Sequence, residues 1–308
     1  MQRTDLVALP GDLRLVDDRH LGRPHVIGTY LLLGDEPAIV DPGPGSTLAS
    51  LEAGLAAHGL GLGDLRAILL THIHLDHAGA TGSIVQRHPH LQVYVHQRGA
   101  PHLIDPEKLI RSATRIYGDQ MDTLWGPILP VPRENAHLLT GGETLRLGRR
   151  ALRVYDAPGH AFHHVLYLDQ GSGAAFVGDV CGICMPDAPL ARPATPPPDI
   201  DIELWLRTLD TLRALDPQAL LLTHFGPTYR PQDYIEDYCA ALLRWSEALR
   251  DSLAAGDDEA AQIEKLRALS LADIGPAAPA EVIALYEQGS GLEMNWQGLA
   301  RYWRKRVG

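Results

Sequence analysis

Hydrophobic and polar positions in the early part of the chain alternate between a strand pattern and a helix pattern. Short apolar runs bounded by Gly or Pro predict buried strands, and stretches with apolar positions three and four residues apart predict helices. The predicted strands lie at 25–34, 37–45, 65–72 and 91–97. The predicted helices lie between them, at 47–59 and 78–88. This order predicts an α/β protein in which helices cover a sheet.

Residues 100–135 break this rhythm. Their apolar spacing predicts one or two helices around 106–125, followed by a Pro-rich loop. Strand patterns return at 143–158, 164–179 and 219–224, and turn-separated pairs in the first two indicate antiparallel hairpins. A Pro-rich loop at 186–198 and a helix at 201–215 precede the last of these strands. We therefore interpret 100–135 as a helical insertion.

The pattern from residue 231 onward is helical, with four amphipathic stretches up to residue 308. In the last stretch, one helix face carries Trp296, Leu299, Tyr302 and Trp303. This apolar face has to be buried on the rest of the chain, over a functional site, or in a second subunit. We place a boundary between a catalytic domain at 1–230 and a helical extension at 231–308 packed on it, and we expect a homodimer.

Composition places the chain among ordinary globular proteins, with 45% hydrophobic and 21% charged residues. The net charge is −11 and the longest basic run is Arg304-Lys305-Arg306, so we expect no nucleic-acid partner. We find no export signal and no uncharged stretch of membrane-spanning length, so we expect no membrane partner and a cytoplasmic location. Three cysteines suit a reducing compartment. Cys181 and Cys184 form a C-x-x-C pair, which is either chemical or simply two small buried side chains.

A dense group of ligand-type residues follows the predicted strand at 65–72. The segment LLTHIHLDHAGATG carries His72, His74, Asp76 and His77. Three further apolar strands lead into His160, Asp179 and His224. A single histidine at a strand end is commonly a hydrogen-bonded structural residue, but four segments of this kind indicate a pocket along one edge of the sheet.

The order H-x-H-x-D-H, then His, Asp and His, resembles the metallo-β-lactamase superfamily, in particular its glyoxalase II and lactonase-like branches. The resemblance covers residues from about 25 to 227 and implies an αβ/βα four-layer sandwich, here with a C-terminal helical extension. It implies two divalent metal ions, for which zinc is our first choice and iron or manganese the alternatives. The first ion would be held by His72, His74 and His160, the second by Asp76, His77 and His224, with Asp179 as the bridge. Asp41 would accept a hydrogen bond from a ligand histidine, and His164 is a further residue of this outer set.

The resemblance implies a hydrolase that cleaves a carboxylic ester, thioester or lactone with a metal-activated bridging hydroxide. Asp76 would also carry a proton to the leaving group, and the candidate donors to the oxyanion are Tyr117, Tyr229 and His163. Val180-Cys181-Gly182 replaces the Tyr-bearing pattern of some lactonases, and the Lys/Arg cluster of glutathione thioesterases is missing. The sequence therefore does not choose among the three substrate classes.

Two questions stay open at this point. The apolar side chains of 100–135 either form core or line a pocket for a small-molecule substrate with an apolar acyl part; they are Leu103, Ile104, Leu109, Ile116, Tyr117, Met121, Leu124, Trp125 and Ile128. The alternative function is a mononuclear-iron, persulfide-dioxygenase-like oxidoreductase. The presence of His224 and the long helical C-terminus argue against it.

Overall fold

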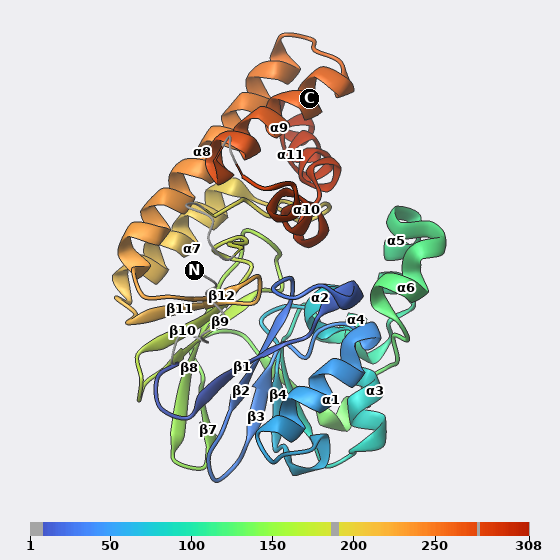
Figure 1. Cartoon of the computed structure of the whole chain (residues 1–308), viewed down its shortest axis with the longest axis vertical. Helices are drawn as coiled ribbons and strands as arrows, with labels where there is room; N and C mark the ends of the chain where they lie inside the picture. The colour runs from blue at the N-terminus through green and yellow to red at the C-terminus, as the bar shows by residue number, and fades with distance from the viewer. Residues whose placement is uncertain (1–8, 186–190, 276–277, 308) are drawn as a thin grey trace.

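Two six-stranded mixed sheets form the centre of the molecule (Figure 1). The computed structural model describes residues 9–185, 191–275 and 278–307. The first sheet contains, in spatial order, β1 (Leu13–Asp17), β2 (Gly28–Leu32), β3 (Ala38–Val40), β4 (Ala67–Leu69), β5 (Gln92–His96) and β6 (Ala136–Leu139). The second contains β12 (Gly226–Thr228), β11 (Ala219–Leu222), β10 (Ala174–Gly178), β9 (Val165–Asp169), β8 (Arg150–Asp156) and β7 (Thr144–Leu147).

The strands predicted from continuous apolar runs are confirmed, and so are the two antiparallel hairpins, β7–β8 and β9–β10. Every residue of β2, β3, β4, β10 and β11 is buried, as expected for strands covered on both faces. The sequence patterns did not predict β1, β6 and β12. All three are edge strands, paired on one side only.

Three apolar cores produce the four layers of the sandwich. The first lies between the first sheet and its outer helices, α1 (Leu48–Ala57) and α3 (Thr81–Arg87). The second lies between the two sheets, where the Tyr30 hydroxyl of β2 also donates to the Leu222 carbonyl of β11 at 2.8 Å. The third packs α7 (Ile202–Ala214) and α8 (Pro231–Ala254) on the second sheet. The predicted αβ/βα four-layer sandwich is therefore confirmed.

The insertion predicted at 100–135 is helical and stands beside the sandwich, to the right in Figure 1. It contains α4 (Ala100–Ile104), α5 (Glu107–Tyr117) and α6 (Met121–Trp125). Trp125 and Ala113 pack on Leu75 of the short helix α2 (Leu75–Ala78), with other apolar side chains of the insertion around them. Short 3-10 turns occur at η1 (His20–Gly22), η2 (Gly45–Thr47), η3 (Leu62–Asp64), η4 (Gly118–Gln120) and η5 (Arg133–Asn135).

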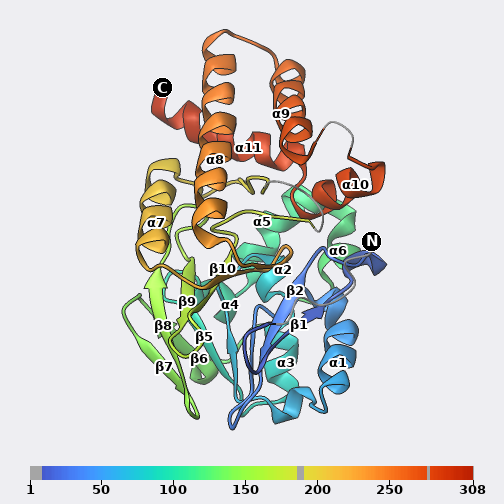
Figure 2. The same cartoon turned by 60° about the vertical axis from the view of Figure 1, so that its left-hand side comes forward.

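The four helices predicted after residue 230 are confirmed as α8, α9 (Glu259–Ile274), α10 (Ala280–Gly289) and α11 (Leu292–Val307). Figure 2 shows α8 and α9 side by side above the sandwich, and α10 lies below α9, near the upper end of the sandwich. The aromatic face of α11 is covered within the chain: Trp296 Nε1 donates to Gln262 of α9, and Trp303 Nε1 donates to the Ser246 carbonyl of α8. The described part of this face thus packs largely on α8 and α9, and the homodimer stays a prediction.

Some sequence expectations fall partly outside the described residues. These are the N-terminal stretch at 1–8 and the part of the Pro-rich loop at 186–190. Among the helices of the described residues, none is long and apolar enough to cross a membrane. Cys181 and Cys184 form no disulfide, and burial raises the pKa of both thiols, which favours the interpretation as packed side chains.

Candidate metal centre

The seven predicted ligands converge at one end of the two sheets, although they come from four separate segments. His72 and His74 follow β4, and α2 carries the next two ligands of this segment. His160 follows β8, Asp179 follows β10 and His224 follows β11. In three groups the candidate ligand atoms all lie within 4.8 Å of one another: His72, His74 and His160; His72, His77 and Asp179; and Asp76, His77 and His224.

The first group presents three imidazole nitrogens to one point. His74 Nδ1 lies 3.0 Å from His72 Nε2 and 3.0 Å from His160 Nε2. Nitrogens that bind one tetrahedral zinc at 2.0–2.1 Å are about 3.4 Å apart, from the tetrahedral angle. The three rings are therefore already close to the spacing that a small divalent ion requires.

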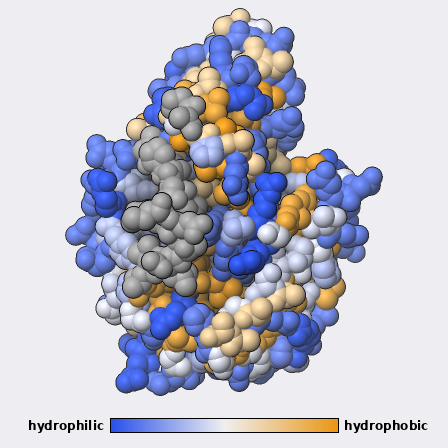
Figure 3. Space-filling view, in the orientation of Figure 1, coloured by the Kyte–Doolittle hydropathy of each residue, from blue (hydrophilic) through white to orange (hydrophobic). Residues whose placement is uncertain are grey.

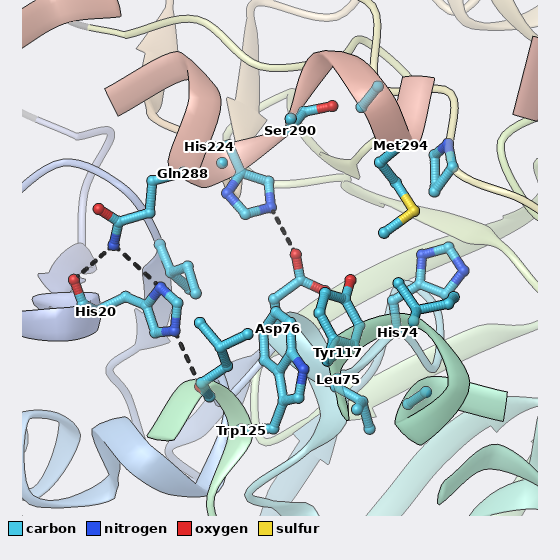
Figure 4. A pocket seen from close by; sticks show the side chains of 18 of the residues that line it. His20, His74, Leu75, Asp76, Tyr117, Trp125, His224, Gln288, Ser290 and Met294 are labelled. Carbon is cyan, nitrogen blue, oxygen red and sulfur yellow. Dashed lines mark hydrogen bonds and ion pairs between the residues drawn. The ribbon is translucent and has the colours of Figure 1, made fainter. Parts of the chain in front are cut away.

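Asp179 lies between the first group and the group of Asp76, His77 and His224. Oδ1 of Asp179 lies 3.2 Å from His77 Nε2 and 3.6 Å from His224 Nε2, whereas Oδ2 lies 3.5 Å from His160 Nε2. One carboxylate thus faces both histidine sets with different oxygens. His224 Nε2 also lies 3.4 Å from Asp76 Oδ2, so Asp76, His77 and His224 form the second histidine-containing set (Figure 4).

Hydrogen bonds at the far side of each ring fix which nitrogen faces the centre. The Nδ1–H of His160 donates to the Ala194 carbonyl at 2.9 Å, and that of His224 donates to the Val26 carbonyl at 2.6 Å. Because a carbonyl only accepts, these bonds place a proton on Nδ1 and turn Nε2 toward the centre. Both rings are thereby oriented so that Nε2 can bind a metal ion.

Asp41 accepts hydrogen bonds from several members of a buried network, and its role next to a metal stays a prediction. Its Oδ2 accepts from His77 Nδ1 at 2.8 Å, from the Thr71 hydroxyl at 2.7 Å and from the Thr223 hydroxyl at 3.1 Å. Because the Thr71 proton is already donated to Asp41, Thr71 Oγ1 accepts from His72 Nδ1 at 3.1 Å. Asp41 therefore orients one ligand histidine of each set.

The electrostatics suit a cation. Burial, reinforced by the neighbouring histidines, holds the pKa of His72 well below its usual value and lowers that of His74 to about 3, so both are neutral at physiological pH. Burial opposes the charge on Asp179, but His77 and His224 bring its pKa well below the usual value. Asp179 Oδ1 is buried and forms no hydrogen bond with any described residue. A buried carboxylate oxygen in this position fits a metal ion that it would bind.

Beside this centre lies a pocket of about 840 Å³. Its walls come from the η1 loop, from α5 and α6, and from the α10–α11 junction (Figure 4). Figure 3 shows apolar surface between the C-terminal helices and the insertion helices. The insertion side chains that line the pocket include Leu109, Ile116, Tyr117, Leu124 and Trp125, so part of the predicted stripe forms a wall as well as a small core.

The remaining predicted residues divide clearly. Tyr117 lines the pocket together with Asp76. Tyr229 follows β12, is 42% exposed and is not among the described residues that line the pocket. His163 is buried behind the ligands, with its ring 5.6 Å from that of His74. His164 stacks on His72 with ring centroids 4.7 Å apart, and its Nε2 accepts from the Asp179 amide at 3.3 Å.

Sequence reasoning missed several lining residues, among them His20, Gln288 and Met294. His20 comes from an irregular loop, and the other two come from the α10–α11 junction. None follows an apolar strand, which was the signal that identified the ligands. The one sign in the sequence was the acidic pair Asp17-Asp18, which Arg19 separates from His20.

Comparisons with known proteins agree with this geometry. A family profile described as the metallo-beta-lactamase superfamily matches residues 23–224. The hydroxyacylglutathione hydrolase of Acidiphilium cryptum is 30% identical over 241 residues, covering 76% of this chain and 74% of that protein. The metallo-beta-lactamase family protein TTHA1429 of Thermus thermophilus superposes with a TM-score of 0.71 at 25% identity, covering 97% of this chain and 95% of that one. The archaeal protein ST1585 of Sulfolobus tokodaii superposes with a TM-score of 0.67 at 20% identity, covering 94% of this chain and 98% of that one. Because the profile matches residues 23–224, most of the two-sheet sandwich, the chain belongs to the metallo-beta-lactamase superfamily.

Proposed function

We propose that the protein is a dinuclear metal-dependent hydrolase of a carboxylic ester, thioester or lactone. The observation that supports this most directly is Asp179, whose two oxygens face two separate histidine sets. Two bound divalent ions, zinc in our proposal, would make a bridging water acidic and polarise the scissile carbonyl. His72, His74 and His160 would hold one ion, and Asp76, His77 and His224 the other.

Asp76 is our candidate for proton transfer. Its side chain is 21% exposed and lines the pocket, so it can reach both the centre and a substrate. Burial opposes its charge, but His77 and His224 bring its pKa below the usual value, so it is ionised at neutral pH. An ionised carboxylate at this position can accept a proton and deliver it to a leaving group.

Tyr117 is our candidate donor to the developing oxyanion. Burial, together with the charge of Asp76, raises the pKa of its hydroxyl, so the proton stays on the oxygen at any pH at which the protein works. The ring is held against Trp125, with centroids 5.1 Å apart in an edge-on arrangement. A fixed, protonated hydroxyl beside the reacting carbonyl stabilises negative charge as it forms.

The walls of the pocket support a substrate with an apolar acyl part. The α5–α6 side is largely apolar, whereas the α10–α11 side offers Gln288, Ser290, Glu293 and Gln297. An acyl chain would lie along the first wall and a polar leaving group along the second. The relatives named hydroxyacylglutathione hydrolase make a thioester the first substrate to test.

The test is a panel of esters, thioesters and lactones with matched acyl groups, assayed with the wild-type protein and with His74→Ala and Asp179→Ala. We expect turnover of at least one class, loss of that activity in both variants, and lower metal content in both. His58→Ala, at an exposed position after α1, is the matched control and should behave like wild type. Iron as the bound metal together with O₂ consumption, and no hydrolysis, would support an oxidoreductase instead.

A further inference from the structure

In the loop between β1 and β2, a polar side chain is buried and the apolar side chain next to it is exposed. His20 is buried, with 2% of its surface exposed, whereas the adjacent Leu21 is 48% exposed. Arg19 and Leu21 flank the histidine with φ values of 50° and 53°, in the left-handed region that such residues rarely adopt. The Asp17 carboxylate holds this shape by accepting from the Arg19 amide at 3.0 Å and from the His25 amide at 2.9 Å. The loop is therefore built to place the His20 ring inside the molecule.

The His20 ring joins two segments that are distant in sequence. Its Nε2 lies 2.9 Å from the Leu124 carbonyl of α6, and because that oxygen only accepts, Nε2 carries the proton. Nδ1 is then an acceptor, and Gln288 Nε2 of α10 donates to it at 3.2 Å. The second proton of the same amide goes to the His20 carbonyl at 2.8 Å (Figure 4). Burial lowers the pKa of His20, which keeps this neutral tautomer at physiological pH.

Both ends of this connection are anchored. On the α6 side, the ring stacks on Trp125 with centroids 5.6 Å apart and planes inclined by 12°. The Ser46 hydroxyl donates to the same Leu124 carbonyl at 2.7 Å. On the α10 side, Glu287 pairs with the buried Arg192 at 2.9 Å, so Gln288 follows a residue that is itself fixed.

This connection forms part of the pocket wall, since His20, Leu124, Trp125 and Gln288 all line it. Most of α10 is only partly buried, with Tyr286 its one fully buried side chain. Tyr286 packs α10 on Ile183, Met185 and Ile274, and the bonds made by Gln288 link α10, through His20, to α6 of the insertion. A shift of α10 would change the space available next to Asp76 and Tyr117.

We propose that His20 is a positioning residue that holds α10 against α6 and thereby sets the size of the acyl group that the pocket accepts. The specificity part rests on the proposed hydrolase function; the positioning part does not. A residue that only stabilised the fold would affect all substrates alike. A residue that sets the pocket wall affects substrates according to their acyl length.

The experiment uses His20→Ala, Gln288→Ala and the double variant in the full chain, with His58→Ala and Gln97→Ala as controls at exposed positions. Esters from acetyl to decanoyl are assayed, and backbone hydrogen exchange is measured over 121–125 and 280–289. We expect both single variants to raise KM roughly tenfold for the long esters, with kcat within about twofold and little change for acetate. The double variant should be no worse than either single one, because both remove the same connection. Exchange in both helices should accelerate, and the controls should match wild type.

Equal losses for all acyl lengths, or additive effects of the two substitutions, would overturn the specificity part. Unchanged exchange in 280–289 in His20→Ala would overturn the positioning part. If the wild-type protein hydrolyses none of the esters, the proposed function has failed, and the exchange measurement still decides whether His20 positions α10.

Discussion

Replacing Asp41 by Asn probes how the centre is organised without touching a proposed ligand. Oδ2 of Asp41 accepts three hydrogen bonds, from His77 Nδ1 and from the hydroxyls of Thr71 and Thr223. Its Oδ1 accepts from the Thr71 amide at 2.8 Å, which keeps that oxygen an acceptor. In Asp41→Asn the new NH₂ group therefore replaces Oδ2 and meets three donors.

The consequences differ for the three partners. The two threonine hydroxyls can rotate and accept from the new amide, but the His77 N–H cannot. His77 can satisfy the amide only by moving its proton to Nε2, the nitrogen that faces Asp179 at 3.2 Å. Loss of such an orienting partner costs about 10–100-fold in metal affinity, or roughly 1.4–2.8 kcal/mol.

We expect Asp41→Asn to weaken one metal site selectively. The set of His72, His74 and His160 depends on Asp41 only through Thr71, so it should retain its metal while the set containing His77 loses occupancy. The assay is competition with a chromophoric chelator, which resolves two affinities in the wild-type protein. Asp64→Asn, an exposed carboxylate at η3, is the control. Two unchanged affinities in Asp41→Asn would refute the assignment of Asp41 as an orienting residue.

Three further substitutions test other parts of the account. Tyr117→Phe should lower kcat and kcat/KM together by about 10²–10³-fold with KM little changed, as for the loss of an oxyanion donor. Tyr229→Phe should match wild type in the same steady-state assay. Equal effects of the two substitutions would contradict the assignment of Tyr117 as the oxyanion donor. Asp18 is buried, and burial raises its pKa well above the usual value. Its stabilising contribution is therefore present below the unfolded pKa and is lost as pH rises through the folded pKa, so Asp18→Asn should gain stability relative to wild type as pH increases. Urea unfolding at several pH values tests this, and a constant difference in unfolding free energy would refute it. A Cβ at Gly298 would lie 1.9 Å from the Thr195 carbonyl oxygen, so Gly298→Ala should destabilise the protein by about 1–3 kcal/mol, and an unchanged midpoint of thermal unfolding would show that α11 can move away at no cost.

The sequence predicted most of the sheet framework because buried strands and helices have distinct apolar periods. The sequence missed β1, β6 and β12, which are edge strands without continuous apolar runs. The fourth edge strand, β7, was predicted because it forms a hairpin with β8. The aromatic face of α11 was recognised, but periodicity cannot say which surface covers a helix, and here it is α8 and α9.

The convergence of the candidate ligands was predictable because each of their four segments follows an apolar strand and because their order resembles a known family. The pocket was harder. Tyr117 and Tyr229 are indistinguishable as sequence features, yet one lies in the wall and the other is 42% exposed. His20 was missed because its position depends on left-handed backbone at two neighbours and on an amide more than two hundred residues away in the chain.

The central claim is that two metal ions act together in one hydrolytic site. The most direct test is a titration of chelator-treated protein with Zn²⁺, in which bound metal and the rate of hydrolysis of the best panel substrate are followed together. We predict that activity rises with the second equivalent and reaches its plateau at two ions per chain. A plateau at one ion per chain, or activity that persists in the chelated protein, would contradict the dinuclear mechanism.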